Sequence, residues 1–456
     1  MTMVEQLAAF VARAAYDDLS PEARAQLKIR TLDALACAAG ALNGEPIQWL
    51  RAHSEDFGGA ELCTLIGGGR TAPDRAAFYN GALVRYLDFN DSFLAPGETC
   101  HPSDNFSAVL AAAEFAGRGG RDLLAALAVA YQVQCRLSEV APVRDKGFDH
   151  TTQGAYAVAA GVSKALGLTV AQTANAIAIA GAAFNALRVT RTGTLSHWKG
   201  LAYPNTALGA THAAFLARRG ITGPPEVFEG NKGFMDAIAG RFEIDWSKEN
   251  LEIVTRTIVK KYNSEIHSQS AVEGVLELKH EHQIAGPDVK RVEIEIFDVA
   301  YKIIGGGEEG DKTVVQIKEQ ADHSLPYIVA VAMLDNQVMP EQYLPERIRR
   351  ADVQNLLRKV QVRPSPDLSR RFPAEMPCRV AIELQDGRTF TREKRDYEGF
   401  HTRPASWQTA AEKFQRLSKR ADPASAKDIV DAVARLETIS AADLSALLAR
   451  LRLVRS

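Results

Sequence analysis

Apolar residues recur every three to four positions over much of the chain, which is typical of helices with one buried face. In the first half, this spacing predicts helices over residues 4–15, 21–40, 74–88, 103–116, 122–139, 153–166, 169–187 and 206–219. Ser20 and Pro21 fit the N-cap and the first position of the second of these helices. The helices at 153–166 and 169–187 are rich in alanine and glycine, so we expect them to approach their neighbours closely at the centre of a helical bundle.

The pattern changes near residue 250, where strands are predicted. Residues 251–262 are rich in β-branched side chains, residues 289–299 alternate apolar with charged positions, and residues 357–364 form a third candidate strand. Residues 377–394 fit a hairpin with Asp386 and Gly387 in its turn. Helical spacing returns over residues 406–417, 424–436 and 441–451.

The simplest packing of these elements is a mainly α protein with two domains. We expect a large all-helical domain built from both chain ends, residues 1–270 and 400–456, and a smaller α+β domain over residues 271–399. The composition, 46% hydrophobic and 24% charged over 456 residues, is that of an ordinary globular protein.

Charge and cysteine content narrow the functional classes. The net charge is −2 and the basic residues lie among acids, so we expect neither a nucleic-acid nor a membrane partner. Five widely spaced cysteines without a Cys-x-x-Cys pair predict reduced thiols and argue against an iron–sulfur cluster. The first residues lack a basic segment and no run of about 18 apolar residues occurs, so we expect a cytoplasmic protein without a secretory signal or membrane span.

The densest group of reactive side chains lies between Arg85 and Asn105. It holds three acids, two hydroxyls and one histidine, namely Asp88, Asp91, Asp104, Ser92, Ser103 and His101. Pro96, Gly97 and Pro102 prevent most of this stretch from being helical, so it is predicted to be a loop held by flanking helices. Such loops often carry reacting groups, although a polar surface loop is the alternative.

Two features of this stretch suggest proton transfer. Asp88 and Asp91 are three residues apart at a predicted helix end, so we expect them on one face, where neighbouring carboxyls split their pKa values. His101 precedes a proline, which predicts extended geometry, and histidine suits proton transfer near neutral pH. The alternative for His101 is a loop histidine bonded to the backbone.

Three further groups carry histidines or cations. His150 precedes the predicted helix that begins near Thr151. The N-terminus of this helix would attract an anion beside His150; alternatively, His150 only neighbours the N-cap. A polar break between two predicted helices holds four basic side chains suited to carboxylates, unless it is only a solvated loop: Arg188, Arg191, His197 and Lys199. His267 and Gln269 precede a predicted helix near the domain boundary, where ligand clefts are common. Together these groups suggest a cofactor-free enzyme that moves protons on a small polyanion.

Six blocks in order resemble the MmgE/PrpD family: LDFNDS, HPSDN, GFDH, SHWKGLAYPN, YNSEIHSQSAVE and ADHSLPYIVAVAMLD. The resemblance covers nearly the whole chain. It implies a large helical domain, a smaller α+β lid domain, a homodimer, and no metal or organic cofactor. It also implies a hydro-lyase acting on 2-methylcitrate or a close relative. Decarboxylation of cis-aconitate, another lyase or epimerase reaction, and a non-catalytic carboxylate-binding dimer are the alternatives.

The resemblance places functional positions on Asp88, Ser92, His101, His150, Lys199 and His267. We therefore expect the catalytic residues to be Asp88, His101, His150 and Lys199. We expect substrate contacts from Asp91, Ser92, Ser103, Arg191, His267 and Gln269. Cations would hold carboxylates, His101 or Asp88 would take a proton, and His150 would assist the leaving hydroxyl.

Two positions beside these residues carry separate expectations. Asn90 departs from the family, because many members carry a second aspartate there. Asp104 is expected only to cap the helix that follows it, since it stands in the first turn after Ser103.

Overall fold

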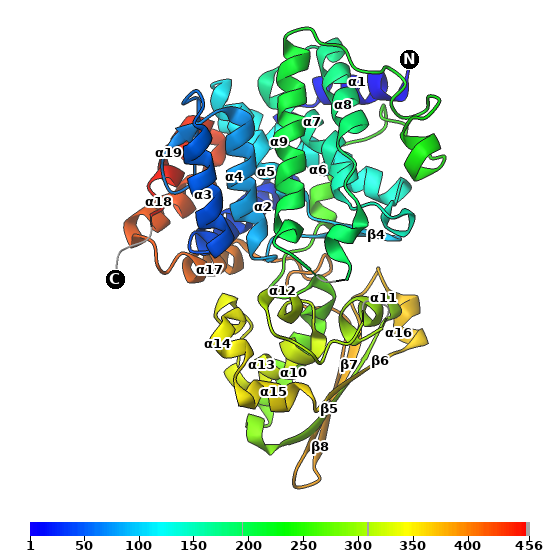
Figure 1. Ribbon diagram of the computed structural model, residues 1–456, viewed down its shortest axis with the longest axis vertical. Coiled ribbons are helices and arrows are strands. Elements are labelled where there is room, and N and C mark those ends of the chain that lie inside the picture. The colour runs from blue at the N-terminus through cyan, green and yellow to red at the C-terminus, as the bar shows by residue number, and fades with distance from the viewer. Residues whose placement is uncertain (194, 308–309, 453–456) are drawn as a thin grey trace. The chain divides into compact units, whose positions relative to one another are not determined.

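The computed structural model describes residues 1–193, 195–307 and 310–452, and all ranges below refer to these residues. Thr194, inside the predicted polar break, and Glu308 and Glu309 therefore lie outside the description. The chain forms two compact units (Figure 1). The first comprises Met1–Arg191, His197–Thr257 and Ser406 onward, and the second comprises Thr192–Ser196 and Ile258–Ala405. The expected mainly α fold is confirmed, with one helical unit built from both chain ends and one smaller α+β unit.

The first unit is helical apart from two short hairpins. Its helices are α1 (Met3–Arg13), α2 (Pro21–Ala41), α3 (Glu45–Phe57), α4 (Pro73–Tyr86), α5 (Phe106–Phe115), α6 (Gly120–Val140), α7 (Thr151–Leu166), α8 (Val170–Ala183), α9 (Trp198–Arg218), α17 (Trp407–Leu417), α18 (Pro423–Ala434) and α19 (Ala441–Ala449). The hairpins are β1–β2 (Cys63–Thr64, Arg70–Thr71) and β3–β4 (Phe93–Ala95, Glu98–Cys100). No helix among the described residues is long and apolar enough to cross a membrane.

Small residues bring the central helices together as expected. Helix α7 is almost wholly buried and packs against α5, α6, α8 and α9. At Gly154, an added Cβ would lie 2.5 Å from the ring of Tyr203 on α9, so only glycine allows this approach. This contact holds the ring of Tyr203 beside the first turn of α7, next to the candidate active site.

The C-terminal helices complete the first unit. Helix α17 packs on α2, and its Lys413 is buried between that helix and the segment after α4. Lys413 Nζ lies 2.6 Å from Oδ1 of Asp33 and donates a 2.7 Å hydrogen bond to the carbonyl of Phe89. The same ammonium stands 3.6 Å from the centroid of the Phe89 ring. We call this arrangement the Lys413 strut, because it links a late helix to the backbone between Asp88 and Asn90.

The second unit is an α+β sandwich of one sheet and several helices. Its strands are β5 (Val289–Ile296), β6 (Val360–Pro364), β7 (Cys378–Leu384) and β8 (Thr389–Lys394), in the order β6-β5-β7-β8. Strands β5 and β6 are parallel and the other pairs antiparallel. The helices are α10 (Gln269–Glu281), α11 (Asp298–Ala300), α12 (Lys318–Ala321), α13 (Leu325–Asp335), α14 (Pro345–Ile348), α15 (Ala351–Leu357) and α16 (Pro366–Arg371). Alternate residues of β7 are buried, and α10 contacts β7 and β8, so the predicted strands 289–299, 357–364 and 377–394 are confirmed.

Two predicted elements are wrong. Residues 251–262 contain only a 3-10 turn, Ile253–Arg256, and no strand. There the hydroxyls of Thr255 and Thr257 donate to carbonyls three residues earlier, which favours a turn over an extended chain. Helix α9 begins at Trp198 rather than Thr206, because Pro204 is accommodated inside the helix instead of ending it. Lys199, predicted in a break, therefore lies in the first turn of α9.

Candidate active site

The site begins where helix α4 ends. The predicted helix to residue 88 stops at Tyr86, and Asp88 adopts a left-handed conformation with φ of 53°. This conformation is uncommon for a residue with a side chain, although aspartate tolerates it better than most. It returns the carboxylate of Asp88 to Arg85, whose Nη1 donates a 2.6 Å hydrogen bond to Oδ1.

Asp88 lies between two buried cations. Its Oδ2 is 3.2 Å from Nζ of Lys199, while Oδ1 accepts from Arg85. The second carboxylate near Arg85 is Asp104, whose Oδ2 is 3.6 Å from Nε. Burial lowers the pKa of Arg85, but Asp88 and Asp104 outweigh it, and the net pKa is raised. Helices α4 and α9 thus bring a Lys199–Asp88–Arg85–Asp104 string of alternating charge into the interior.

His101 follows a hairpin that the sequence did not predict. Strands β3 and β4 pair Phe93 with Cys100, and Gly97 takes a φ of 76° in the turn. His101 Nδ1 lies 2.8 Å from the backbone carbonyl of Asp91 and 3.1 Å from Oγ of Ser92. A carbonyl only accepts, so Nδ1 carries a proton and the lone pair of the neutral ring is on Nε2. The backbone bond expected of an ordinary loop histidine is present, and it also sets the tautomer of the ring.

Asp91 does not share a face with Asp88. Its Oδ1 accepts from the backbone N–H of Ser103 and its Oδ2 from the hydroxyl of Tyr131 on α6. Burial raises the pKa of Asp91, although Arg30 and the hydrogen bonds from Ser103 and Tyr131 oppose this effect. The expectation of one carboxylate pair is wrong because α4 ends before Asp88. Asp91 instead braces the loop that carries His101.

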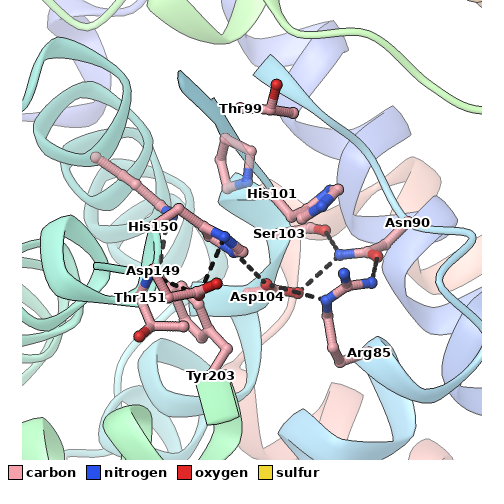
Figure 2. A network of polar contacts seen from close by, with 12 residues as sticks. Arg85, Asn90, Thr99, His101, Ser103, Asp104, Asp149, His150, Thr151 and Tyr203 are labelled. Carbon is pink, nitrogen blue, oxygen red and sulfur yellow. Dashed lines mark hydrogen bonds and ion pairs between the residues drawn. The ribbon is translucent and has the colours of Figure 1, made fainter. Parts of the chain in front are cut away.

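Asp104 is not a helix cap, and the helix predicted over residues 103–116 begins only at Phe106. A 3-10 turn, Pro102–Asn105, precedes α5, and neither segment has a side-chain cap. The amide of Asn90 donates to Oγ of Ser103 at 2.9 Å and to Oδ1 of Asp104 at 2.8 Å (Figure 2). Burial raises the pKa of Asp104 to about 7, against the lowering effect of Arg85 and Arg191. Asn90 thus donates two hydrogen bonds that an ionised aspartate at this position could not donate.

His150 lies between two carboxyl groups. Its Nδ1 is 3.2 Å from Oδ1 of Asp149, and its Nε2 is 4.0 Å from Oδ2 of Asp104. Figure 2 shows the ring directed toward Asp104, with Tyr203 beside it. The centroids of the His150 and His101 rings are 5.4 Å apart. Burial, followed by the effect of Arg191 and other nearby arginines, holds the pKa of His150 well below its ordinary value, so the ring is neutral.

Arg191 is engaged within the same cluster. Its Nε donates a 2.6 Å hydrogen bond to Oδ2 of Asp149, and its Nη1 donates to the carbonyl of Lys199. The guanidinium therefore orients both the partner of His150 and the first turn of α9. Its expected contact with a substrate carboxylate remains a prediction.

His267 and Gln269 lie in the second unit. Nδ1 of His267 is 2.8 Å from Oε1 of Glu265, whose Oε2 accepts from the His267 backbone N–H. Among the described residues, Nε2 of His267 is buried and has no hydrogen-bond partner. The side chain of Gln269 bonds the backbone of Lys261 and Tyr262, so it braces the preceding loop. Contact of either residue with a substrate stays a prediction.

Replacing Glu265 with glutamine should destabilise the second unit at neutral pH. Burial alone would raise the pKa of Glu265, but His267 and nearby cations lower it from 4.5 to about 2. A carboxyl group whose pKa is lower in the folded state than in the unfolded state stabilises the folded state at pH values above the unfolded-state pKa. Here this contribution is about 3 kcal/mol, and it is lost as the pH falls from 4.5 to 2. Hydrogen exchange of peptides within residues 260–282 measures it.

A matched control accompanies this measurement. Exchange in the Glu265→Gln protein should be faster than in wild type at pH 7, and the difference should shrink toward pH 3. Glu346→Gln, at an exposed position of the same unit, should change little. Equal exchange in Glu265→Gln and wild type at pH 7 would contradict the stabilising role of this carboxylate.

Asp322 and His323 are the adjacent acid and imidazole of the second unit that could contribute to a metal site. Oδ1 of Asp322 is 2.6 Å from Nδ1 of His323, and its Oδ2 is 2.8 Å from Nζ of Lys318. The ammonium already neutralises this carboxylate. Two side chains are fewer than the three or four protein ligands of a typical zinc site, so this pair alone does not define one.

The first unit brings together most of the predicted site residues: Asp88, Asp91, Ser92, His101, Ser103, His150, Arg191 and Lys199. Sequence reasoning missed four of their partners, namely Arg85, Asn90, Asp104 and Asp149. A signal existed for Arg85, since a charged residue inside the apolar run LVRYL of a predicted helix must be paired if it is buried. Asp149 precedes His150 in the GFDH block, and no spacing rule predicts that the two side chains pair.

Family models match both halves of the chain. The MmgE/PrpD N-terminal domain matches residues 5–247, and the MmgE/PrpD C-terminal domain matches residues 262–438. Over 357 residues the chain is 28% identical to the 2-methylcitrate dehydratase of Salmonella typhimurium, covering 73% of this chain and 72% of that protein. Over 395 residues it is 26% identical to the cis-aconitate decarboxylase of Mus musculus, covering 81% and 77%. The 2-methylcitrate dehydratase of Cupriavidus necator is 30% identical over 292 residues, covering 59% and 58%.

Proposed function

Because the chain belongs to the MmgE/PrpD family, we propose that it is a lyase that dehydrates a small tricarboxylate, 2-methylcitrate or a close relative, without a metal or organic cofactor. The two activities of its named relatives, dehydratase and decarboxylase, are both lyase reactions. The expected family and enzyme class are therefore confirmed. The substrate, the independence from cofactors and the homodimer belong to the proposal.

The fixed tautomer of His101 is the observation that best supports this reaction. The carbonyl of Asp91 binds Nδ1–H, so the basic lone pair is held on Nε2. A neutral imidazole held in one orientation suits removal of a proton from carbon next to a carboxylate. We assign His101 as this base and Asp88 as the residue that positions Lys199, a choice that the sequence left open.

Cations would bind the carboxylates of the substrate. Lys199 already lies 3.2 Å from a carboxylate oxygen, and each close pair is worth about 4 kcal/mol at an effective dielectric of 20, before desolvation. Arg191 and His267 are the further candidates for this task. His150 would protonate the departing hydroxyl, so the C–H electron pair forms the alkene and the C–O pair leaves with water.

The reaction is tested by incubating the purified protein with 2-methylcitrate and, separately, with cis-aconitate. Dehydration should produce the absorbance of a new conjugated alkene from 2-methylcitrate, whereas a decarboxylase should release CO2 from cis-aconitate. The decarboxylase is the second candidate, because a relative so named aligns over 81% of this chain. Activity that is lost with a chelator and restored by iron would contradict the cofactor-free mechanism. Binding of both compounds without turnover would favour a carboxylate-binding protein.

A further inference from the structure

Three buried polar atoms meet at one point of the site. They are Oδ2 of Asp104, Nε of Arg85 and Nε2 of His150, and none has a hydrogen-bond partner among the described residues. The carboxylate oxygen lies 3.6 Å from the arginine nitrogen and 4.0 Å from the histidine nitrogen. Figure 2 shows the carboxyl group of Asp104 between these two side chains. Buried polar atoms are rarely left without partners, so this junction requires a chemical explanation.

The proton positions around His150 supply one. Arg191 donates a 2.6 Å hydrogen bond to Oδ2 of Asp149, which leaves Oδ1 of that group as the acceptor for Nδ1–H of His150. The lone pair of neutral His150 then lies on Nε2, facing Asp104. A lone pair and an ionised carboxylate repel each other, whereas a carboxylic acid can donate to that lone pair. Oδ1 of Asp104 already accepts from Asn90, which leaves Oδ2 as the oxygen that holds the proton.

We propose that Asp104 stores a proton on Oδ2 and supplies it to Nε2 of His150 during turnover. The 4.0 Å separation is longer than a hydrogen bond, so a small side-chain rotation must close it before transfer. Asp104 acts through His150 and is a positioning residue rather than one that touches the substrate. The next step rests on the proposed lyase function: His150 passes the proton received on Nε2 to the hydroxyl that leaves as water and so returns to its Nδ1–H tautomer, while His101 holds the proton removed from carbon. Solvent returns one proton to Asp104 and removes one from His101, so each turnover balances.

Asp104 and His150 have different roles because their surroundings shift their pKa values in opposite directions. The pKa of Asp104 is raised to about 7 by burial, so this group can store and release a proton near neutral pH. Burial, and after it the neighbouring arginines, lowers the pKa of His150 and keeps the ring neutral, so it relays a proton and does not store one. The ionisable and charged groups that act on Asp104 are Arg85, Asp91, His150, Arg191 and Tyr203, and the thiols of Cys100 and Cys135 lie near Tyr203.

The storage step can be tested without any substrate. The chain has ten histidines, and labelling them with 13C at Cε1 allows each to be followed by NMR, with His150 assigned from a His150→Gln variant. We expect the His150 signal to shift near pH 7 as Asp104 ionises, and this inflection to vanish in Asp104→Asn. No inflection in wild type, or one that persists in Asp104→Asn, overturns the proposal. Because no turnover is measured, this result stands apart from the choice of substrate.

Two further variants keep the test decisive. Glu98→Gln removes another buried carboxyl of raised pKa, which accepts from the N–H groups of Val143 and Arg144, and it should preserve the inflection. Asn90→Ala removes a hydrogen bond that favours the ionised form of Asp104, so it should move the inflection above pH 7. If Asp104→Asn fails to fold, an unmoved inflection in Asn90→Ala overturns the proposal by itself.

Kinetics then connect storage to catalysis. With an active substrate, kcat should fall above pH 7, because the protonated form of Asp104 is required. Asp104→Asn should lower kcat about 100-fold at pH 6.5 and abolish this descending limb, while Glu98→Gln should retain the limb. An Asp104→Asn enzyme with the wild-type pH profile overturns the proposal even when the lyase assignment holds.

Discussion

Replacing His101 with asparagine should lower kcat about 1,000-fold without unfolding the protein. The asparagine amide can take the place of Nδ1–H and donate to the carbonyl of Asp91, so the loop should keep its anchor. It has no counterpart to Nε2, and general-base catalysis by a positioned side chain contributes about 100- to 10,000-fold. Steady-state kinetics on the substrate identified above, together with circular dichroism, measure the two effects.

The control for this variant is His212→Asn. His212 lies on the outer part of α9 with 60% of its side chain exposed, so its replacement should leave turnover and fold unchanged. If His101→Asn retained wild-type kcat with an intact fold, His101 would not be the base. Asp88 would then be the next candidate to remove the proton.

Replacing Lys199 with methionine should lower kcat/KM about 1,000-fold, mainly through a higher KM. Methionine keeps an unbranched apolar stem but loses the ammonium that pairs with Asp88 and would bind a substrate carboxylate. A close charge pair worth about 4 kcal/mol corresponds to roughly three factors of ten in affinity. The Asp88 carboxylate keeps its 2.6 Å bond from Arg85, so the local fold should persist.

Two comparisons sharpen this prediction. Lys199→Arg should recover part of the lost kcat/KM, because it restores the charge but not the geometry. Lys427→Met, at a lysine with 76% of its side chain exposed, should have no effect. An unchanged KM in Lys199→Met would show that Lys199 does not bind the substrate.

The sequence predicted elements whose pattern is local. Ser20 and Pro21 mark the start of α2, and Ser20 does accept the N–H of Ala23. Strand β7 shows the alternation of buried and partly exposed positions that its sequence implies. Both signals arise from neighbouring residues, so no knowledge of tertiary packing is needed.

Features that depend on distant partners could not be predicted this way. Proline usually ends a helix, yet α9 continues through Pro204, which lies close to Gly81 of α4. Asp104 was expected to be a cap because its position in the chain fits one, but its neighbours are Arg85 of α4 and His150, the residue that precedes α7. The family resemblance indicated His101, His150 and Lys199, which lie within one cluster of the first unit, since ordered sequence blocks preserve information that spacing rules lack.

The Lys413 strut limits the positions at which related chains can recombine. The family's C-terminal domain match runs from 262 to 438 and so includes α17, although that helix belongs to the first structural unit. Recombination at the border between the two family domains would separate Lys413 from Asp33 and Phe89, which it joins.

Asp33, Phe89 and Lys413 should therefore vary together among relatives. Working chimaeras should exchange Ile258–Ala405 as a cassette, with two crossovers, instead of exchanging everything after residue 257. Such a cassette leaves the backbone between Asp88 and Asn90 held by its original lysine. The two ends of the chain should therefore come from the same parent protein, whereas the segment between them can be replaced.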